Sequence, residues 1–207
     1  MKITFGIRVG RVILAVLRPF VFCLFPYRFI HRENIPATDG KYVVCCNHIS
    51  MVDPVYLLLA CRFPIFFMAK EELFHNRFFG WLIKTCFGVF PVSRGKGDTT
   101  AITTSLSILE NEHVLGIFPE GTRSKDGTLG NAKSGTAMIA AKAQAPILPC
   151  AVFTKNGKVK LFHKTTVVFG EPLSLEDLHL DTDKPDIRFA SRKIMAVIGD
   201  LIEENRI

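Results

Sequence analysis

The sequence lacks the short motifs that mark several large enzyme classes. It has no C-x-x-C pair, no H-E-x-x-H and no other Cys/His cluster, which disfavours a metal site. It has no G-x-S-x-G nucleophile elbow, which weakens a serine-hydrolase interpretation. Residues 92–97 (VSRGKG) lack the G-x-x-x-x-G-K-[ST] spacing, so an NTPase interpretation fails. We therefore expect a site that uses neither a metal ion nor a serine nucleophile.

The six cysteines show no pattern of a disulfide framework. Most of them lie inside apolar runs, where a free cysteine behaves as a small hydrophobic residue. We interpret them as reduced and structural, which fits a compartment facing the cytosol. They are Cys23, Cys45, Cys46, Cys61, Cys86 and Cys150.

The composition is both basic and hydrophobic. The 207 residues include 26 Lys+Arg and 19 Asp+Glu, a net charge of +7, and 48% are hydrophobic. The mean hydropathy of +0.26 is high for a protein that lies free in water. This length fits one domain with its own core. A chain that is both basic and hydrophobic favours an anionic membrane surface as its partner. No basic stripe with interleaved aromatics occurs, so we expect no nucleic acid as partner.

Residues 1–32 form a distinct segment that contains no acidic residue. Its apolar stretch, residues 12–26, is interrupted by Arg18 and Pro19, so a transmembrane span is marginal. No small-residue cleavage site follows, which disfavours a signal peptide. We expect two short helices that lie in the membrane interface, and a buried helix pair is the alternative. The predicted organisation is a membrane-interface helical segment over 1–32 and an α/β domain over 33–207. The basic residues are Lys2, Arg8, Arg11, Arg18, Arg28 and Arg32.

Strand and helix patterns alternate through the rest of the chain. This alternation predicts an α/β fold with helices on both faces of a largely parallel central sheet. Short apolar runs predict strands at 41–46, 64–69, 88–92, 113–119 and 146–153, and an edge strand or hairpin at 158–170. Helices are predicted at 54–62, 73–86 with a break near Gly80, 98–111, 131–144 and 186–205.

The first candidate site residues are His48 and Asp53, which follow the predicted strand 41–46. Strand ends are where open α/β sheets bind ligands. Across a strand–turn–helix corner the two side chains can converge, so that the carboxylate orients the imidazole as a general base. The alternative is that Asp53 only caps the helix, followed by Pro54 at its first position, and that His48 is an ordinary loop residue.

The second candidate is the stretch FPEGTRS, residues 118–124, which follows another predicted strand. Gly121 allows a turn, and the amides after it could converge with Arg123 on a phosphate. The alternative is a surface turn in which Arg123 pairs with Glu120. Lys70 and Arg94 also follow predicted strands and are further candidate phosphate ligands; the alternative is that each is a solvated surface cation. In a parallel sheet all these strand ends share one edge.

Four blocks together resemble the glycerolipid acyltransferases. NHISMVDP resembles their N-H-x4-D block, GVFPVSR the next block, FPEGTRS the second hallmark block, and APILP the proline-bearing block that follows. They occur in the family's order across about residues 41–152. Ser93 departs from the pattern, because the family often has Asp before the Arg.

The resemblance implies transfer of a fatty acyl group from acyl-CoA or acyl carrier protein to the 2-hydroxyl of lysophosphatidic acid. His48 would be the base and Asp53 its orienting carboxylate. The acceptor would be bound by Lys70, Arg94, Glu120, Gly121, Thr122 and Arg123. No organic cofactor or metal is needed, and the location would be the cytoplasmic face of a membrane. Acylation of glycerol 3-phosphate or another lysophospholipid, a non-catalytic membrane-binding module, and a membrane-associated phosphohydrolase remain alternatives.

Overall fold

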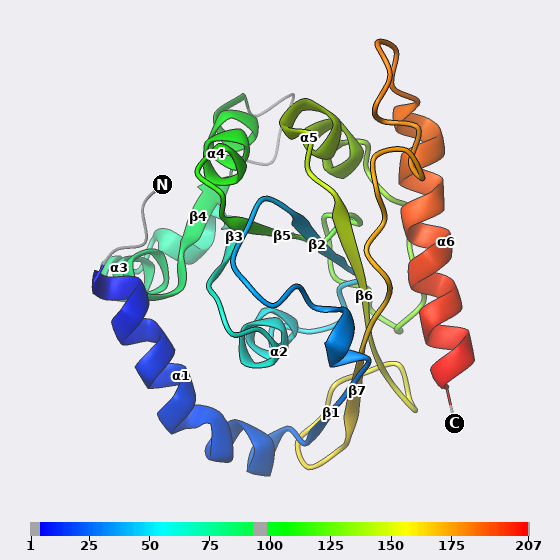
Figure 1. Ribbon diagram of the computed structural model, residues 1–207. Coiled ribbons are helices and arrows are strands. Elements are labelled where there is room, and N and C mark those ends of the chain that lie inside the picture. The colour runs from blue at the N-terminus through cyan, green and yellow to red at the C-terminus, as the bar shows by residue number, and fades with distance from the viewer. Residues whose placement is uncertain (1–4, 93–98, 207) are drawn as a thin grey trace.

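The core of the protein is one seven-stranded sheet with strand order β1-β7-β6-β2-β5-β3-β4 (Figure 1). The computed structural model describes residues 5–92 and 99–206. The strands are β1 (Tyr27–Ile30), β2 (Val43–Cys46), β3 (Ile65–Lys70), β4 (Val89–Val92), β5 (Val114–Ile117), β6 (Ile147–Thr154) and β7 (Thr165–Phe169).

The sheet is largely parallel, as the sequence predicts. β6, β2, β5, β3 and β4 all run in one direction. β7 pairs antiparallel with β6, and β1 pairs parallel with β7, so these two strands run the opposite way. The predicted edge strand at 158–170 is wrong in two respects: the strand begins at Thr165, and it lies between β6 and β1.

Helices cover both faces of this sheet, which confirms the predicted α/β fold (Figure 1). Alternate residues of β2 enter opposite cores: Val43 and Cys45 pack with α4, α5 and α6, whereas Val44 and Cys46 pack with α2. This explains why the strand reads as a continuous apolar run. The helices are α1 (Phe5–Leu24), α2 (Asp53–Ala60), α3 (Arg77–Phe87), α4 (Thr99–Glu110), α5 (Gly135–Ala143) and α6 (Ile187–Asn205).

The prediction of two short N-terminal helices is wrong. α1 is one helix that continues through Pro19, and residues 27–30 are a strand of the sheet. The reason is tertiary packing: α1 lies against α3 at Gly6 and Gly10, and a Cβ atom on Gly10 would overlap the carbonyl oxygen of Cys86. This packing supports the first half of α1, and the helix continues past Pro19 although that residue removes one backbone hydrogen bond. No described helix is both long and apolar enough to cross a bilayer.

The predicted break near Gly80 is also misplaced. A short 3-10 helix (Glu71–Phe74) ends first, and α3 then begins after Asn76, whose side chain accepts a hydrogen bond from Phe79 N at 3.0 Å. Gly80 lies inside α3, where a Cβ atom would come within 2.9 Å of the Phe74 Cα. The glycine therefore allows close packing and does not end the helix.

Candidate active site

The candidate residues meet at the carboxyl edge of the parallel strands. β2 and β5 pair with Cys45 opposite Ile117, and His48 and Glu120 each lie three residues beyond that pair. The Glu120 carboxylate accepts a hydrogen bond from the His48 backbone N–H at 2.9 Å. Lys70 ends β3, which pairs with the other side of β5. The expectation that these strand ends share one edge is therefore confirmed.

His48 and Asp53 form a hydrogen-bonded pair. His48 Nδ1 lies 2.8 Å from Asp53 Oδ2, and the imidazole stacks on Phe118 with 4.0 Å between ring centroids. A carboxylate can only accept, so Nδ1 carries the proton and donates it. The Nε2 atom of the neutral ring then has an available lone pair. Among the described residues no hydrogen bond occupies Nε2, and 17% of the His48 side chain is exposed. The arrangement can therefore accept a proton from a ligand.

Asp53 organises the corner between β2 and α2. Its Oδ2 accepts from Ile49 N and Ser50 N at 2.7 Å each, in addition to His48 Nδ1, and its side chain is fully buried. It makes no capping hydrogen bond to α2. The capping interpretation is therefore wrong, because the carboxylate binds the chain that precedes the helix. Its position at the start of α2 also favours the negative charge.

Asn47 fixes the end of β2 and was not singled out from the sequence. Its side chain is 2% exposed, donates to Val152 O at 2.8 Å and accepts from Val152 N at 2.7 Å. These two bonds hold β2 against β6 just before His48. A buried polar residue between an apolar strand and a histidine is the signal that could have found it.

Glu120 joins two loops of the site. Its Oε1 accepts from His48 N, and its Oε2 accepts from Gly130 N at 2.9 Å. The carboxylate is buried and bonds to these two amides, so the alternative of a surface turn in which Arg123 pairs with Glu120 is wrong. These contacts position the loops, while direct contact between Glu120 and a substrate stays a prediction.

The turn at residues 121–123 presents cations at the edge. Gly121 has φ of +68°, which favours glycine. A Cβ atom there would lie 2.9 Å from Lys133 Nζ, so the Lys133 side chain lies across the turn. Thr122 and Arg123 are exposed, and among the described residues neither Arg123 nor Lys133 forms an ion pair. Lys133 was missed from the sequence because it resembles an ordinary surface lysine.

The loop after Arg123 is held in place by hydrogen bonds. Ser124 N donates to His48 O at 2.7 Å. The Thr128 hydroxyl and amide, with the Ser124 hydroxyl, donate to Asp126 and lower the pKa of its carboxyl to about 2. The Arg123 turn is thus fixed relative to His48.

Comparison with known proteins agrees with this geometry. The acyltransferase family model matches residues 27–153, which contain both His48 and Arg123. The protein belongs to the acyltransferase family.

Two curated relatives of this acyltransferase are named 1-acyl-sn-glycerol-3-phosphate acyltransferase. The one from Streptococcus pneumoniae is 32% identical over 85% of this chain and 66% of the relative. The one from Bacillus subtilis is 36% identical over 71% of this chain and 73% of the relative. The solved structure of the Thermotoga maritima 1-acyl-sn-glycerophosphate acyltransferase, PlsC, is similar with a TM-score of 0.73. It covers 97% of this chain and 80% of that one at 22% identity, and supports the fold.

The structure gives less support to the two other predicted phosphate ligands, Lys70 and Arg94. Lys70 Nζ lies 3.1 Å from Glu72 Oε1, so this cation already has a carboxylate partner. Arg94 lies outside the described residues. Within the described ranges no group of His, Cys, Asp and Glu is arranged to hold a metal ion.

The cysteines of the acyltransferase fit a structural role. Cys23 is exposed, and the other five are buried. Burial raises the pKa of Cys61 to about 12 and also raises the pKa of Cys45 and Cys46. These thiols are protonated at neutral pH and are poor nucleophiles.

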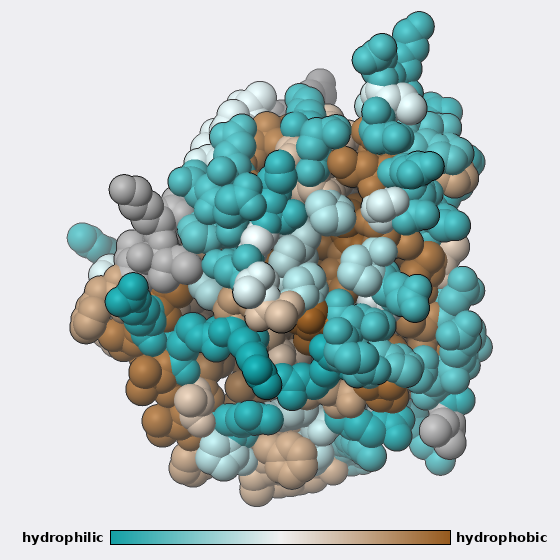
Figure 2. All heavy atoms as spheres, in the orientation of Figure 1, coloured by the Kyte–Doolittle hydropathy of each residue, from teal (hydrophilic) through white to brown (hydrophobic). Residues whose placement is uncertain are grey.

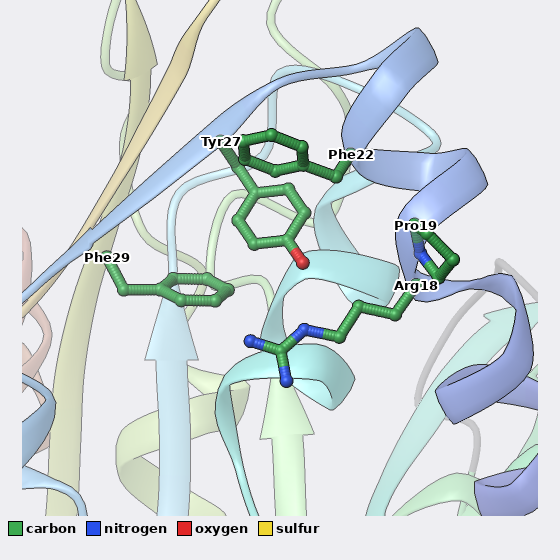
Figure 3. A pocket seen from close by; sticks show the side chains of 5 residues that line it. All are labelled: Arg18, Pro19, Phe22, Tyr27 and Phe29. Atoms are coloured by element: carbon green, nitrogen blue, oxygen red, sulfur yellow. The ribbon is translucent and has the colours of Figure 1, made fainter.

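A hollow of about 440 Å³ lies where α1 meets β1. Figure 3 shows the Arg18 side chain reaching from α1 toward Tyr27 and Phe29, with Phe22 above Tyr27. Tyr27 pairs with Thr165, which pairs with Thr154 at the end of β6, so the hollow is at the same sheet edge as His48. It combines aromatic walls with one guanidinium group.

Proposed function

We propose that the protein transfers a fatty acyl chain from an acyl thioester to the 2-hydroxyl of lysophosphatidic acid and so makes phosphatidic acid. The observation that carries this proposal is the His48–Asp53 pair, whose Nε2 is available at the carboxyl edge beside unpaired cations. Family membership and the names of the relatives support the same reaction. A module that only binds membranes would have no use for an oriented base.

The chemical step needs one proton acceptor and no covalent enzyme intermediate. His48 Nε2 takes the proton of the 2-hydroxyl while that oxygen attacks the thioester carbonyl carbon. The carbon–sulfur bond then breaks, and the imidazolium returns the proton to the departing thiolate. An ester and a free thiol result. Asp53 stabilises the imidazolium and keeps the ring oriented. The step requires neither a metal ion nor an organic cofactor.

The acceptor phosphate would bind at the turn beyond β5. Arg123 presents a planar fork that fits phosphate oxygens, and Lys133 adds a second positive charge across Gly121. Thr122 lies in the same exposed turn. Lys70 could join after exchanging its partner Glu72, and Arg94, which follows β4 in the sequence, is the other proposed phosphate ligand. The acyl donor would be acyl-CoA or acyl carrier protein.

The membrane surface of the protein would be formed by α1 and α3. Apolar side chains of α1 remain exposed, including Val12 (64%), Val16 (62%) and Phe20 (64%). On α3, Phe78 is 73% and Trp81 is 58% exposed. Figure 2 shows hydrophobic side chains gathered over α1. A patch of this kind with flanking arginines fits an anionic leaflet, so we propose a monotopic enzyme on the cytoplasmic face.

The α1–β1 hollow gives this surface a place for a lipid chain. Its aromatic walls would contact methylene groups, and Arg18 would face an anionic head group. Because the hollow and His48 share one edge of the sheet, a lipid could enter from the bilayer without crossing the protein.

The decisive assay crosses acceptors with donors. Purified protein would receive radiolabelled lysophosphatidic acid, lysophosphatidylcholine or glycerol 3-phosphate, each with acyl-CoA or acyl carrier protein. We expect turnover with lysophosphatidic acid, and a loss of about 10²–10⁴-fold in rate for His48→Ala. His113→Ala is the matched control, because His113 forms its own pair with Asp39 before β5, at the opposite edge. Equal activity of the two variants would exclude His48 as the base.

Membrane binding is tested by substitution within α1. Deleting residues 1–30 would remove β1 from the sheet, so a deletion would confuse binding with folding. Val16→Glu with Phe20→Glu places charge on the exposed face and should weaken binding to anionic vesicles. Arg192→Glu on the exposed side of α6 is the control. Undiminished vesicle binding of the α1 variant would place the contact elsewhere.

A further inference from the structure

A second cavity, of about 340 Å³, lies on the other face of the sheet from His48. Its floor is a row of neighbours across three strands: Arg28 pairs with Thr166, and Thr166 pairs with Phe153. Phe153 packs in the core that contains α6, whereas its neighbour Val152 packs in the core that contains α2. A ligand in this cavity would therefore be separate from the acceptor at His48.

The lining of this cavity is strongly basic. Lys155 directly follows β6 and Lys164 directly precedes β7, and the pairing of Thr154 with Thr165 places these two lysines opposite each other. Arg28 and Arg206 add two more cations, and none of the described residues that line the cavity is acidic. Like charges at opposite positions of paired strands repel. An anion between them would relieve that repulsion.

Arg28 provides an independent sign of a missing partner. Its Nε atom is buried and, among the described residues, has no hydrogen-bond acceptor. Buried side-chain donors are normally satisfied. Asn205 and Arg206, at the end of α6, also line the cavity. Arg206 forms an exposed ion pair with Glu203 at 3.5 Å, whereas Arg28 forms no ion pair with any described residue.

We propose that this cavity binds the phosphate groups of a small phosphorylated molecule. Arginine forks and lysine ammonium groups are the usual protein ligands of phosphate, and the volume lies in the range of small-molecule sites. The lysine end of the cavity is at the carboxyl edge, where β6 ends. Coenzyme A and free diphosphate carry the same phosphate chemistry, and the experiment separates them. The proposal does not depend on the reaction assigned to His48.

The test is isothermal titration of the full chain with inorganic diphosphate and, separately, with coenzyme A and 3′-dephospho-coenzyme A. All proteins would carry Arg123→Ala, so that the turn near His48 contributes little anion binding. Lys155→Ala with Lys164→Ala should weaken binding at least about tenfold. The control is Lys158→Ala with Lys160→Ala, which removes equal charge from the same connection outside the cavity.

The outcomes are distinct. Coenzyme A is identified as the ligand if the Lys155/Lys164 variant loses coenzyme A binding and the parent binds 3′-dephospho-coenzyme A more weakly than coenzyme A. Loss of diphosphate binding alone identifies a free phosphate ligand. Equal affinities for the Lys155/Lys164 variant and its control, or binding of neither diphosphate nor coenzyme A by the parent at millimolar concentration, would overturn the proposal. All four substituted lysines are exposed, so the fold should be retained.

Discussion

Replacing Asp53 by asparagine separates the catalytic role of this carboxylate from its structural role. In the protein, Oδ2 accepts three hydrogen bonds, from His48 Nδ1, Ile49 N and Ser50 N. An asparagine oxygen at the same position can keep the two amide bonds. The negative charge that stabilises an imidazolium is lost. If the amide NH2 turns toward His48, the ring must take the other tautomer, and Nε2 loses its lone pair.

The two effects differ greatly in size. A charge-assisted hydrogen bond contributes about 1.5–3 kcal/mol and a neutral one about 0.5–1.5 kcal/mol, and removal of a buried charge offsets part of the difference. A net destabilisation near 2 kcal/mol would lower Tm by roughly 4–8 °C for a chain of this size. Turnover should fall by about 10²–10⁴-fold, because the base is weakened or has the wrong tautomer.

The measurement is the initial rate of phosphatidic acid formation together with a thermal melt. Asp39→Asn is the matched control, since Asp39 accepts from His113 Nδ1 at 3.2 Å away from the carboxyl edge. That variant should keep its rate. A rate for Asp53→Asn within about threefold of the parent would refute the assignment of Asp53 as the carboxylate that supports His48 as the base.

Three further predictions concern phosphate binding by Arg123, the packing of α1 against α3, and the accessibility of the cysteines. Arg123→Ala should raise the acceptor KM about 10–100-fold in steady-state kinetics and leave the donor KM nearly unchanged; equal shifts would contradict a phosphate role. Gly10→Val should force α1 away from α3 and lower Tm in a melt, whereas Gly40→Val, with open space around its Cβ, should not. Iodoacetamide at neutral pH should modify only Cys23 in the native protein by mass spectrometry, because the other thiols are buried; modification of Cys61 would contradict this.

The sequence was sufficient where structure is determined locally. The apolar run before His48 predicts a buried strand, and Asp53 follows His48 by only five positions. A strand–turn–helix corner of that length brings the two side chains together with no information from distant parts of the chain. The alternation of strands and helices likewise predicts a parallel sheet, whose carboxyl edge collects Lys70, His48 and Glu120.

The sequence was insufficient where a contact joins distant residues. Asn47 bonds to Val152, 105 positions away, and no short pattern contains both. Lys133 reaches Gly121 only because Lys133 N donates to Pro119 O and brings the two segments together. α1 continues through Pro19 and packs against α3 at Gly6 and Gly10, a contact between distant segments that local propensity does not describe.

The backbone connections around His48 have a consequence for acceptor selection. His48 N donates to Glu120, and His48 O accepts from Ser124 N, so the base is tied on both sides to the turn that carries Arg123. Glu120 is buried and also holds Gly130, which leaves little freedom for the turn to move alone. If Arg123 holds the acceptor phosphate, the fixed backbone of the turn therefore limits the range of distances from that phosphate to His48 Nε2. Such a site favours an acceptor whose hydroxyl is a fixed, short number of bonds from its phosphate. In lysophosphatidic acid the 2-hydroxyl is on the carbon next to the phosphate-bearing carbon, which meets this requirement.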